Sequence, residues 1–153
     1  MRKYFYALFG LVLFTLLTQA ARQEKHEEKA ASSRTLKIKL KYTGAGTVDE
    51  KHRIFVVLFD SPEFTHGGAM PMATKAATAK DETVTFSDLT TSPVYIAASY
   101  DPSGNYDGES GPPPSGASLG MYSKTPGTPE PVTLEAGKTV QVEVVFNDTV
   151  KMP

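Results

Sequence analysis

Short segments in which apolar and polar residues alternate recur along the chain. In residues 35–42 the apolar side chains stand at every second position, and Lys37, Lys39 and Lys41 lie between them. A period of two is typical of a strand with one buried face and one solvated face. The three lysines favour an edge position in a sheet, because charge at an edge discourages pairing with another molecule.

A second segment, residues 53–60, is apolar on both faces and rich in β-branched and aromatic residues. This composition predicts a central strand that is covered on both sides. Alternation returns in residues 82–86, where Val84 and Phe86 are expected to point inward, and the apolar segment 93–100 follows after a turn. These two segments are predicted to pair as antiparallel neighbours.

The other strand signals stand in the rest of the chain. Short strands are expected near residues 72–77, at a sheet edge, and near residues 119–123, within a stretch rich in proline and glycine. Residues 139–147 alternate clearly, and a turn at residues 135–138 separates them from residues 131–134, which predicts a terminal hairpin. No amphipathic helical period of useful length is present, so the pattern predicts an all-β domain of two packed sheets.

The first twenty residues have a different character. Arg2 and Lys3 precede an apolar run over residues 4–17, and Thr18 and Ala20 supply the small residues of a cleavage site. This order of charge, apolar run and small residues is typical of a secretory signal peptide. Residues 1–20 are therefore predicted to be removed after Ala20, and the protein is expected to be periplasmic or secreted.

After cleavage, residues 21–34 are expected to form a flexible charged tether and residues 35–150 the β-sandwich domain. The chain has no cysteine, which excludes disulfides and a lipid anchor on cysteine. Cleavage leaves 14 basic and 17 acidic residues, and this mild negative charge argues against nucleic acid as a partner. No second segment is apolar enough to insert into a membrane after signal cleavage.

The sequence offers few residues for catalysis. It has no cysteine nucleophile and no Gly-x-Ser-x-Gly motif, and only His52 and His66 are available as bases within the domain. The protein is therefore expected not to be an enzyme.

Oxygen-bearing side chains occupy every second position from residue 101 to residue 109. Such spacing suits a chain that wraps a hard cation, so calcium is the candidate cofactor. The segment departs from the EF-hand pattern twice, with Tyr106 at the turn glycine and Pro112 at the bidentate glutamate. The alternative is an Asx-rich surface turn that holds no metal. The candidate calcium ligands are Asp101, Ser103, Asn105, Asp107 and Glu109.

A second candidate metal site combines one imidazole and two thioethers. His66, Met70 and Met72 lie within seven residues, and soft sulfur ligands together with histidine suit Cu(I) outside the cytoplasm. The alternative is a loop whose methionines cover the edge of the sandwich, because methionine is a common gap filler.

Three segments resemble a known type of exported domain. They are residues 55–62, residues 84–89, and residues 94–101 followed by Gly104-Asn105-x-Asp107-Gly108. They resemble exported bacterial domains of the transthyretin-like or carboxypeptidase regulatory-like type, within an uncharacterised family. The resemblance implies a Greek-key β-sandwich (transthyretin-like or Ig-like) of about seven strands, with no catalytic residues to carry over.

Together these observations predict an exported, non-enzymatic binding or structural module. Its partner is expected to be a protein or another component of the cell envelope, of unknown identity. The alternative is a periplasmic copper-handling protein or an enzyme of unknown class.

Overall fold

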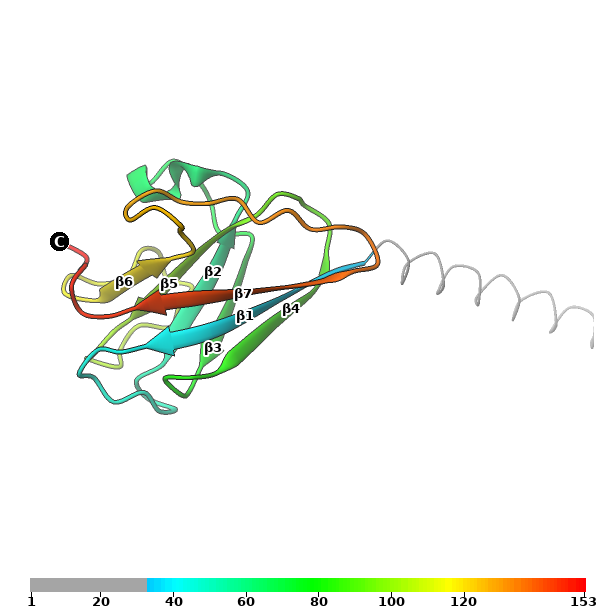
Figure 1. The fold of residues 1–153 in the computed structure, drawn as a ribbon. Coiled ribbons are helices and arrows are strands. Elements are labelled where there is room, and N and C mark those ends of the chain that lie inside the picture. The colour runs from blue at the N-terminus through cyan, green and yellow to red at the C-terminus, as the bar shows by residue number, and fades with distance from the viewer. Residues whose placement is uncertain (1–32) are drawn as a thin grey trace, which may run out of the picture.

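A computed structural model describes residues 33–153 of the chain (Figure 1). The expected signal peptide, residues 1–20, lies outside the described residues, as does all but the end of the expected tether, residues 21–34. The fold begins with β1 at Arg34, one residue before the predicted start of the first strand. Within the described part of the chain, no helix is long and apolar enough to cross a membrane.

Residues 33–153 contain seven strands and one short 3₁₀ helix. They are β1 (Arg34–Tyr42), β2 (Ile54–Phe59), η1 (Pro62–His66), β3 (Ala73–Ala77), β4 (Thr83–Leu89), β5 (Tyr95–Tyr100), β6 (Ser118–Met121) and β7 (Thr139–Phe146). The two short strands expected near residues 72–77 and 119–123 are present as β3 and β6. The prediction of an all-β sandwich of about seven strands is confirmed.

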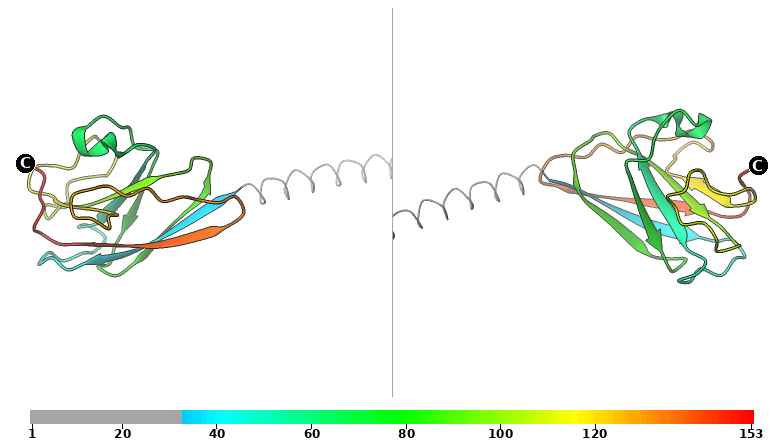
Figure 2. Two further views of the ribbon diagram at one scale, coloured as in Figure 1. Left: turned by 45° about the horizontal axis from the view of Figure 1, so that its top comes forward. Right: turned by 180° about the vertical axis from the view of Figure 1, so that it is seen from behind.

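The strands form two sheets that pack face to face. The three-stranded sheet has the order β4-β1-β7, and the four-stranded sheet has the order β3-β2-β5-β6. β1 and β7 run parallel, with Thr35 beside Thr139 and Tyr42 beside Phe146, whereas the other strand pairs are antiparallel. The three-stranded sheet faces the viewer in Figure 1 and the four-stranded sheet faces the viewer from behind (Figure 2). As predicted, residues 53–60 supply a central strand, β2.

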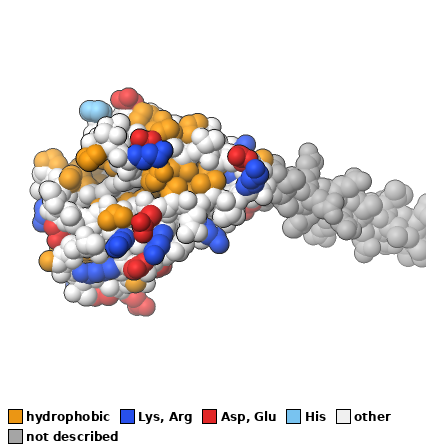
Figure 3. All heavy atoms as spheres, viewed as in Figure 1, with side chains coloured by type: hydrophobic (Ala, Val, Ile, Leu, Met, Phe, Trp, Pro, Cys, Tyr) orange, Lys and Arg blue, Asp and Glu red, His pale blue; other side chains and the backbone are white. Residues whose placement is uncertain are grey.

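The expectation that residues 35–42 form an edge strand is wrong, because β1 lies between β4 and β7. Lys37, Lys39 and Lys41 occupy the outer, solvated face of the three-stranded sheet, and the Lys39 ammonium lies 3.7 Å from the Asp81 carboxylate. Side chains of both charge signs are interspersed over this face (Figure 3). The lysines therefore mark a wet face of the strand rather than its position in the sheet.

The predicted pairing of residues 82–86 with residues 93–100 is also wrong. β4 pairs with β1, whereas β5 pairs with β2 and β6, so the two strands lie in different sheets. Alternation shows which face of a strand is buried, but it carries no information on the neighbour. In a sandwich, consecutive strands can bury their apolar faces against each other from opposite sheets equally well.

The predicted terminal hairpin forms its turn but not its pairing. Lys138 N–H donates to Glu135 O (3.2 Å), as a turn requires, yet Gly137 N–H donates to Ser33 O (2.8 Å). This contact directs the chain along β1, and β7 pairs with that strand in parallel. Residues 131–134 remain in the other layer, where Val132 exchanges two hydrogen bonds with Val94 (3.0 and 2.8 Å).

The core lies between the two sheets and is built from alternate residues of their strands. Each large apolar side chain that is fully buried contributes about 1.5–3 kcal/mol, before the loss of conformational entropy is counted. The fully buried residues of the core include Leu36, Ile38 and Leu40 of β1, Ile54, Val56 and Leu58 of β2, and Ile96 of β5.

Candidate functional site

The segment between β5 and β6 spans residues 101–117, and we call it the β5–β6 loop. It is anchored on Phe55 of β2, whose ring points away from the core shared by the two sheets. Phe55 is nevertheless only 3% exposed. The ring of Tyr106 meets it edge-on with 5.1 Å between centroids, and a side chain at Gly108 would collide with it. The loop therefore covers the outer face of the four-stranded sheet at this point.

Asp101 organises the first half of the loop. Its carboxylate is buried and accepts hydrogen bonds from Ser103 N–H (2.9 Å), Ser103 Oγ (2.6 Å), Asn105 N–H (3.1 Å) and Tyr106 N–H (3.1 Å). Burial raises the pKa of Asp101, but the hydrogen bonds from Ser103, Tyr106 and Asn105 outweigh it and hold the pKa below its usual range. The carboxylate thus serves as the internal acceptor of a tight turn.

Asp107 organises a second, separate turn. It accepts hydrogen bonds from the Ser110 hydroxyl and from the main-chain N–H groups of Glu109 (2.8 Å) and Ser110 (2.8 Å). The bond from the Ser110 hydroxyl is the largest cause that lowers the pKa of Asp107 to about 2. Asp107 is therefore ionised at neutral pH and engaged by its own turn.

These two turns bear on the candidate calcium ligands. The structure brings Ser103 and Asn105 to Asp101, and it brings the main chain of Glu109 to Asp107. Within residues 33–153, no three acidic or histidine side chains gather as a metal site would require. An ion held by Asp101 would have to displace N–H and O–H donors of the loop. Calcium binding therefore stays a prediction.

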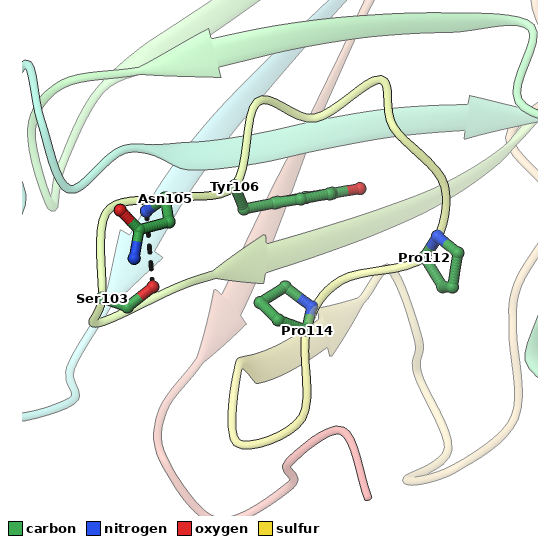
Figure 4. Close-up of a pocket in the computed structure, with 5 residues that line it drawn as sticks. All are labelled: Ser103, Asn105, Tyr106, Pro112 and Pro114. Carbon is green, nitrogen blue, oxygen red and sulfur yellow. Dashed lines mark hydrogen bonds between the residues drawn. The ribbon is translucent and has the colours of Figure 1, made fainter.

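The β5–β6 loop forms an open surface hollow of about 310 Å³, which sequence reasoning missed. Tyr106, Pro112 and Pro114 supply apolar walls, while Ser103 and Asn105 place a hydroxyl and an amide at its rim (Figure 4). The Tyr106 hydroxyl donates to Gly111 O (2.8 Å), which fixes the ring across the loop. Apolar walls with a few polar groups at the rim are typical of ligand sites.

Two buried polar atoms lie beside Phe55 on the same sheet face as the loop. Ser99 is paired with Phe55 across the strands, and the Arg53 guanidinium lies 5.1 Å from the Phe55 ring centroid. Among the described residues, Arg53 Nε and Ser99 Oγ are buried without a hydrogen-bond partner. Such groups are rare in folded proteins, and both of these lie at the junction between the loop and the sheet.

The residues of the candidate copper site lie in and after η1. His66 Nδ1 lies 3.0 Å from Thr65 Oγ1 and 3.9 Å from the Glu63 carboxylate. The Met70 side chain is 83% exposed, and Met72 is 37% exposed. All three donors are thus accessible, and copper binding stays a prediction. The other histidine within residues 33–153, His52, contacts Asp49 through Nδ1 (3.0 Å) in a surface turn.

Comparison with protein-family models, with curated protein sequences and with solved structures returned no match. The geometry of the fold and of the β5–β6 loop therefore carries the functional argument. One signal for the hollow was present in the sequence, since Tyr106 is an isolated aromatic residue in a polar, glycine-rich segment. The apolar outer face of residues 53–60 also implied that another segment covers it.

Proposed function

We propose that this chain is an exported, non-enzymatic β-sandwich module that binds a protein or another component of the cell envelope through the β5–β6 loop. The observation that carries the proposal is the hollow formed by Tyr106, Pro112 and Pro114, with Ser103 and Asn105 exposed at its rim. Phe55 anchors the loop beneath it, so a ligand would meet a preformed surface. The periplasmic or secreted location rests on the leader in residues 1–20.

The chemistry of the loop supports binding rather than catalysis. A general acid or base works best with a pKa near the operating pH. The pKa values of Asp101 and Asp107 are instead lowered, and both carboxylates accept hydrogen bonds from residues of the loop itself. We also propose kinship with transthyretin-like or carboxypeptidase regulatory-like domains, which the two-sheet architecture supports without identifying a particular family.

Site-specific photocrosslinking in the native cell tests the proposal. A benzoylphenylalanine residue at Ser103 would sit at the rim of the hollow, and the same residue at Thr83 would sit on the outer face of the opposite sheet as a matched control. We expect one dominant adduct, identified by mass spectrometry, from position 103 and not from position 83. Changing Asn105 to Ala, an exposed position, should reduce the yield of this adduct.

Two results would contradict the proposal. Equal adducts from positions 103 and 83 would show that the hollow is no preferred site. Turnover of a general hydrolase substrate that disappears on changing His52 or His66 to Ala would show that the protein is an enzyme.

A further inference from the structure

Among residues 33–153, three of the four sheet edges carry a feature that hinders the addition of another strand. The C-terminal residues pair with β6, since Leu119 N–H donates to Val150 O (2.9 Å) and Met152 N–H donates to Ala117 O (2.8 Å). On the opposite side of the sandwich, the Lys75 ammonium of β3 donates to Thr85 O of β4 (2.6 Å). A lysine at an edge blocks strand addition. This contact therefore protects both β3 and β4.

The free edge of β7 has no such protection. Thr35 N–H donates to Lys138 O (3.1 Å) and Thr43 N–H donates to Phe146 O (2.9 Å). The main-chain N–H and C=O groups of the even-numbered residues of β7 therefore point toward β1. The main chain of the odd-numbered residues points the other way, because the hydrogen-bonding direction alternates along a strand. No residue within 33–153 hydrogen bonds to the main chain of these odd-numbered positions, which are Thr139, Gln141, Glu143 and Val145.

The composition of β7 offers little that blocks an edge, since Glu143 is its one charged residue. The strand contains no proline, glycine or lysine, and four of its eight residues are valine. Val145 is 54% exposed on its outer face. On the inner side, Val140 and Val142 are only half-buried, and Figure 3 shows apolar side chains gathered between β7 and the segment that joins it to β6. A long, valine-rich edge strand of this kind is suited to pairing with another strand.

The sequence of β7 is complementary to itself in the antiparallel direction. Around Val142 it reads Val-Gln-Val-Glu-Val, from Val140 to Val144. In an antiparallel pair centred on Val142, each Gln141 stands opposite Glu143 of a second copy, and the amide donates to the carboxylate. The valines then meet one another on the inner face, and Thr139 of one copy covers Val145 of the other. Both Gln141 and Glu143 have their main-chain groups on the free edge, as a hydrogen-bonded pair requires.

We propose that two copies of this chain associate through β7, antiparallel about Val142, so that their three-stranded sheets join into one continuous sheet. This surface is distinct from the β5–β6 loop, which lies over the other sheet. Dimerisation therefore leaves both hollows open and presents two of them in one particle.

Sedimentation equilibrium tests the proposal, on protein that is expressed as the whole chain and then purified. We expect a monomer–dimer equilibrium for the wild type. Gln141→Glu sets two pairs of like charges directly opposite each other and should weaken the dimer about 2- to 30-fold. Gln141→Lys creates two opposite-charge pairs and should tighten it by a similar factor. Gln141 is exposed and stands beside Lys37 of β1, so urea unfolding of both variants separates an effect on the fold from an effect on the dimer.

Thr83→Glu and Thr83→Lys are matched controls, because they change the same charges at an exposed position of β4, on the far side of β1. They should leave the dimer unchanged. A wild-type protein that remains monomeric up to about 1 mM would overturn the proposal. The free edge of β7 would then be available only to a strand of another protein. A dimer that is insensitive to both Gln141 variants would overturn the proposal as well, and equal weakening by both would refute the register about Val142.

Discussion

The phenolic hydroxyl of Tyr42, at the end of β1, donates a hydrogen bond to the carboxylate of Asp148, which follows β7. The same carboxylate accepts hydrogen bonds from the Ser118 hydroxyl of β6 (2.7 Å) and from Ala45 N–H (2.8 Å). The Tyr42 ring packs against Phe146 with 5.0 Å between centroids. One carboxylate thus joins strands from both sheets at one end of the sandwich.

We expect Asp148→Asn to lower the free energy of unfolding by about 1–2 kcal/mol, because an amide cannot accept all three hydrogen bonds. Tyr42→Phe keeps the ring but removes one donor, and should cost about 1 kcal/mol. The double variant should lose less than the sum of the two, since both changes remove the same bond. Urea unfolding measures all three. Strict additivity would show that the Tyr42–Asp148 bond contributes nothing.

This cluster also predicts how stability depends on pH. Hydrogen bonds from Tyr42, Ala45 and Ser118 lower the pKa of Asp148 from 3.8 to about 2. Because the pKa of Asp148 is lower in the folded protein than in the unfolded chain, its ionised carboxylate stabilises the fold at pH values above 3.8. That contribution is lost as the pH falls from 3.8 towards 2. The stability difference between the wild type and Asp148→Asn should therefore shrink over this window. A difference that stays constant down to pH 2 would contradict the prediction.

At alkaline pH the same cluster loses stability as the pH rises, because the pKa of Tyr42 is raised rather than lowered. Burial, followed by the hydrogen bond to Asp148, raises the pKa of Tyr42 from 10.0 to about 12. The neutral phenol therefore stabilises the fold below pH 10, and this contribution is lost as the pH rises from 10 to 12. Tyr42→Phe should lose less stability than the wild type across that window, as followed by urea unfolding at each pH. Identical alkaline profiles would show that Tyr42 titrates as it does in the unfolded chain.

Gly108 tests how the β5–β6 loop is anchored. It has φ of +84°, and a Cβ there would lie 2.3 Å from Phe55 Cδ1. Gly116 has nearly the same φ, +85°, but no atom within 4 Å of its Cβ position. Gly116→Ala should cost about 1 kcal/mol from backbone strain alone. Gly108→Ala should cost about 1–3 kcal/mol more, because the loop must move off Phe55. Equal losses in urea unfolding would show that this contact is not tight.

Thermal melting tests calcium binding by the β5–β6 loop. A loop without a bidentate glutamate should bind calcium with a Kd of about 10⁻⁴–10⁻³ M. Millimolar calcium would then stabilise the fold by about 0.4–1.4 kcal/mol, a shift of several degrees at most. Asp101→Asn combined with Asp107→Asn should abolish the shift between EDTA and calcium. If the wild type melts at the same temperature in both, the segment is an Asx-rich turn alone.

Sequence alone was sufficient for the fold class and for the buried faces of most strands. Leu36, Ile38 and Leu40 are all fully buried, as the period of two predicted. The central position of β2 followed from its apolar character on both faces. Of the candidate calcium ligands, Asp101 and Asp107 do organise the β5–β6 loop. Their carboxylate oxygens, however, accept hydrogen bonds from N–H and O–H groups of the loop, which the spacing of residues cannot reveal.

What the sequence by itself determined is therefore local: which segments are strands, which face of each is buried, and where the chain turns. Only the tertiary structure decided which strands are neighbours, and it placed β7 in parallel beside β1 instead of in a hairpin with residues 131–134. It also brought Tyr42 to Asp148 and Phe55 to Tyr106, which are far apart along the chain. The reason is physical, because alternation records burial at each position, whereas pairing depends on how all the apolar faces are packed together.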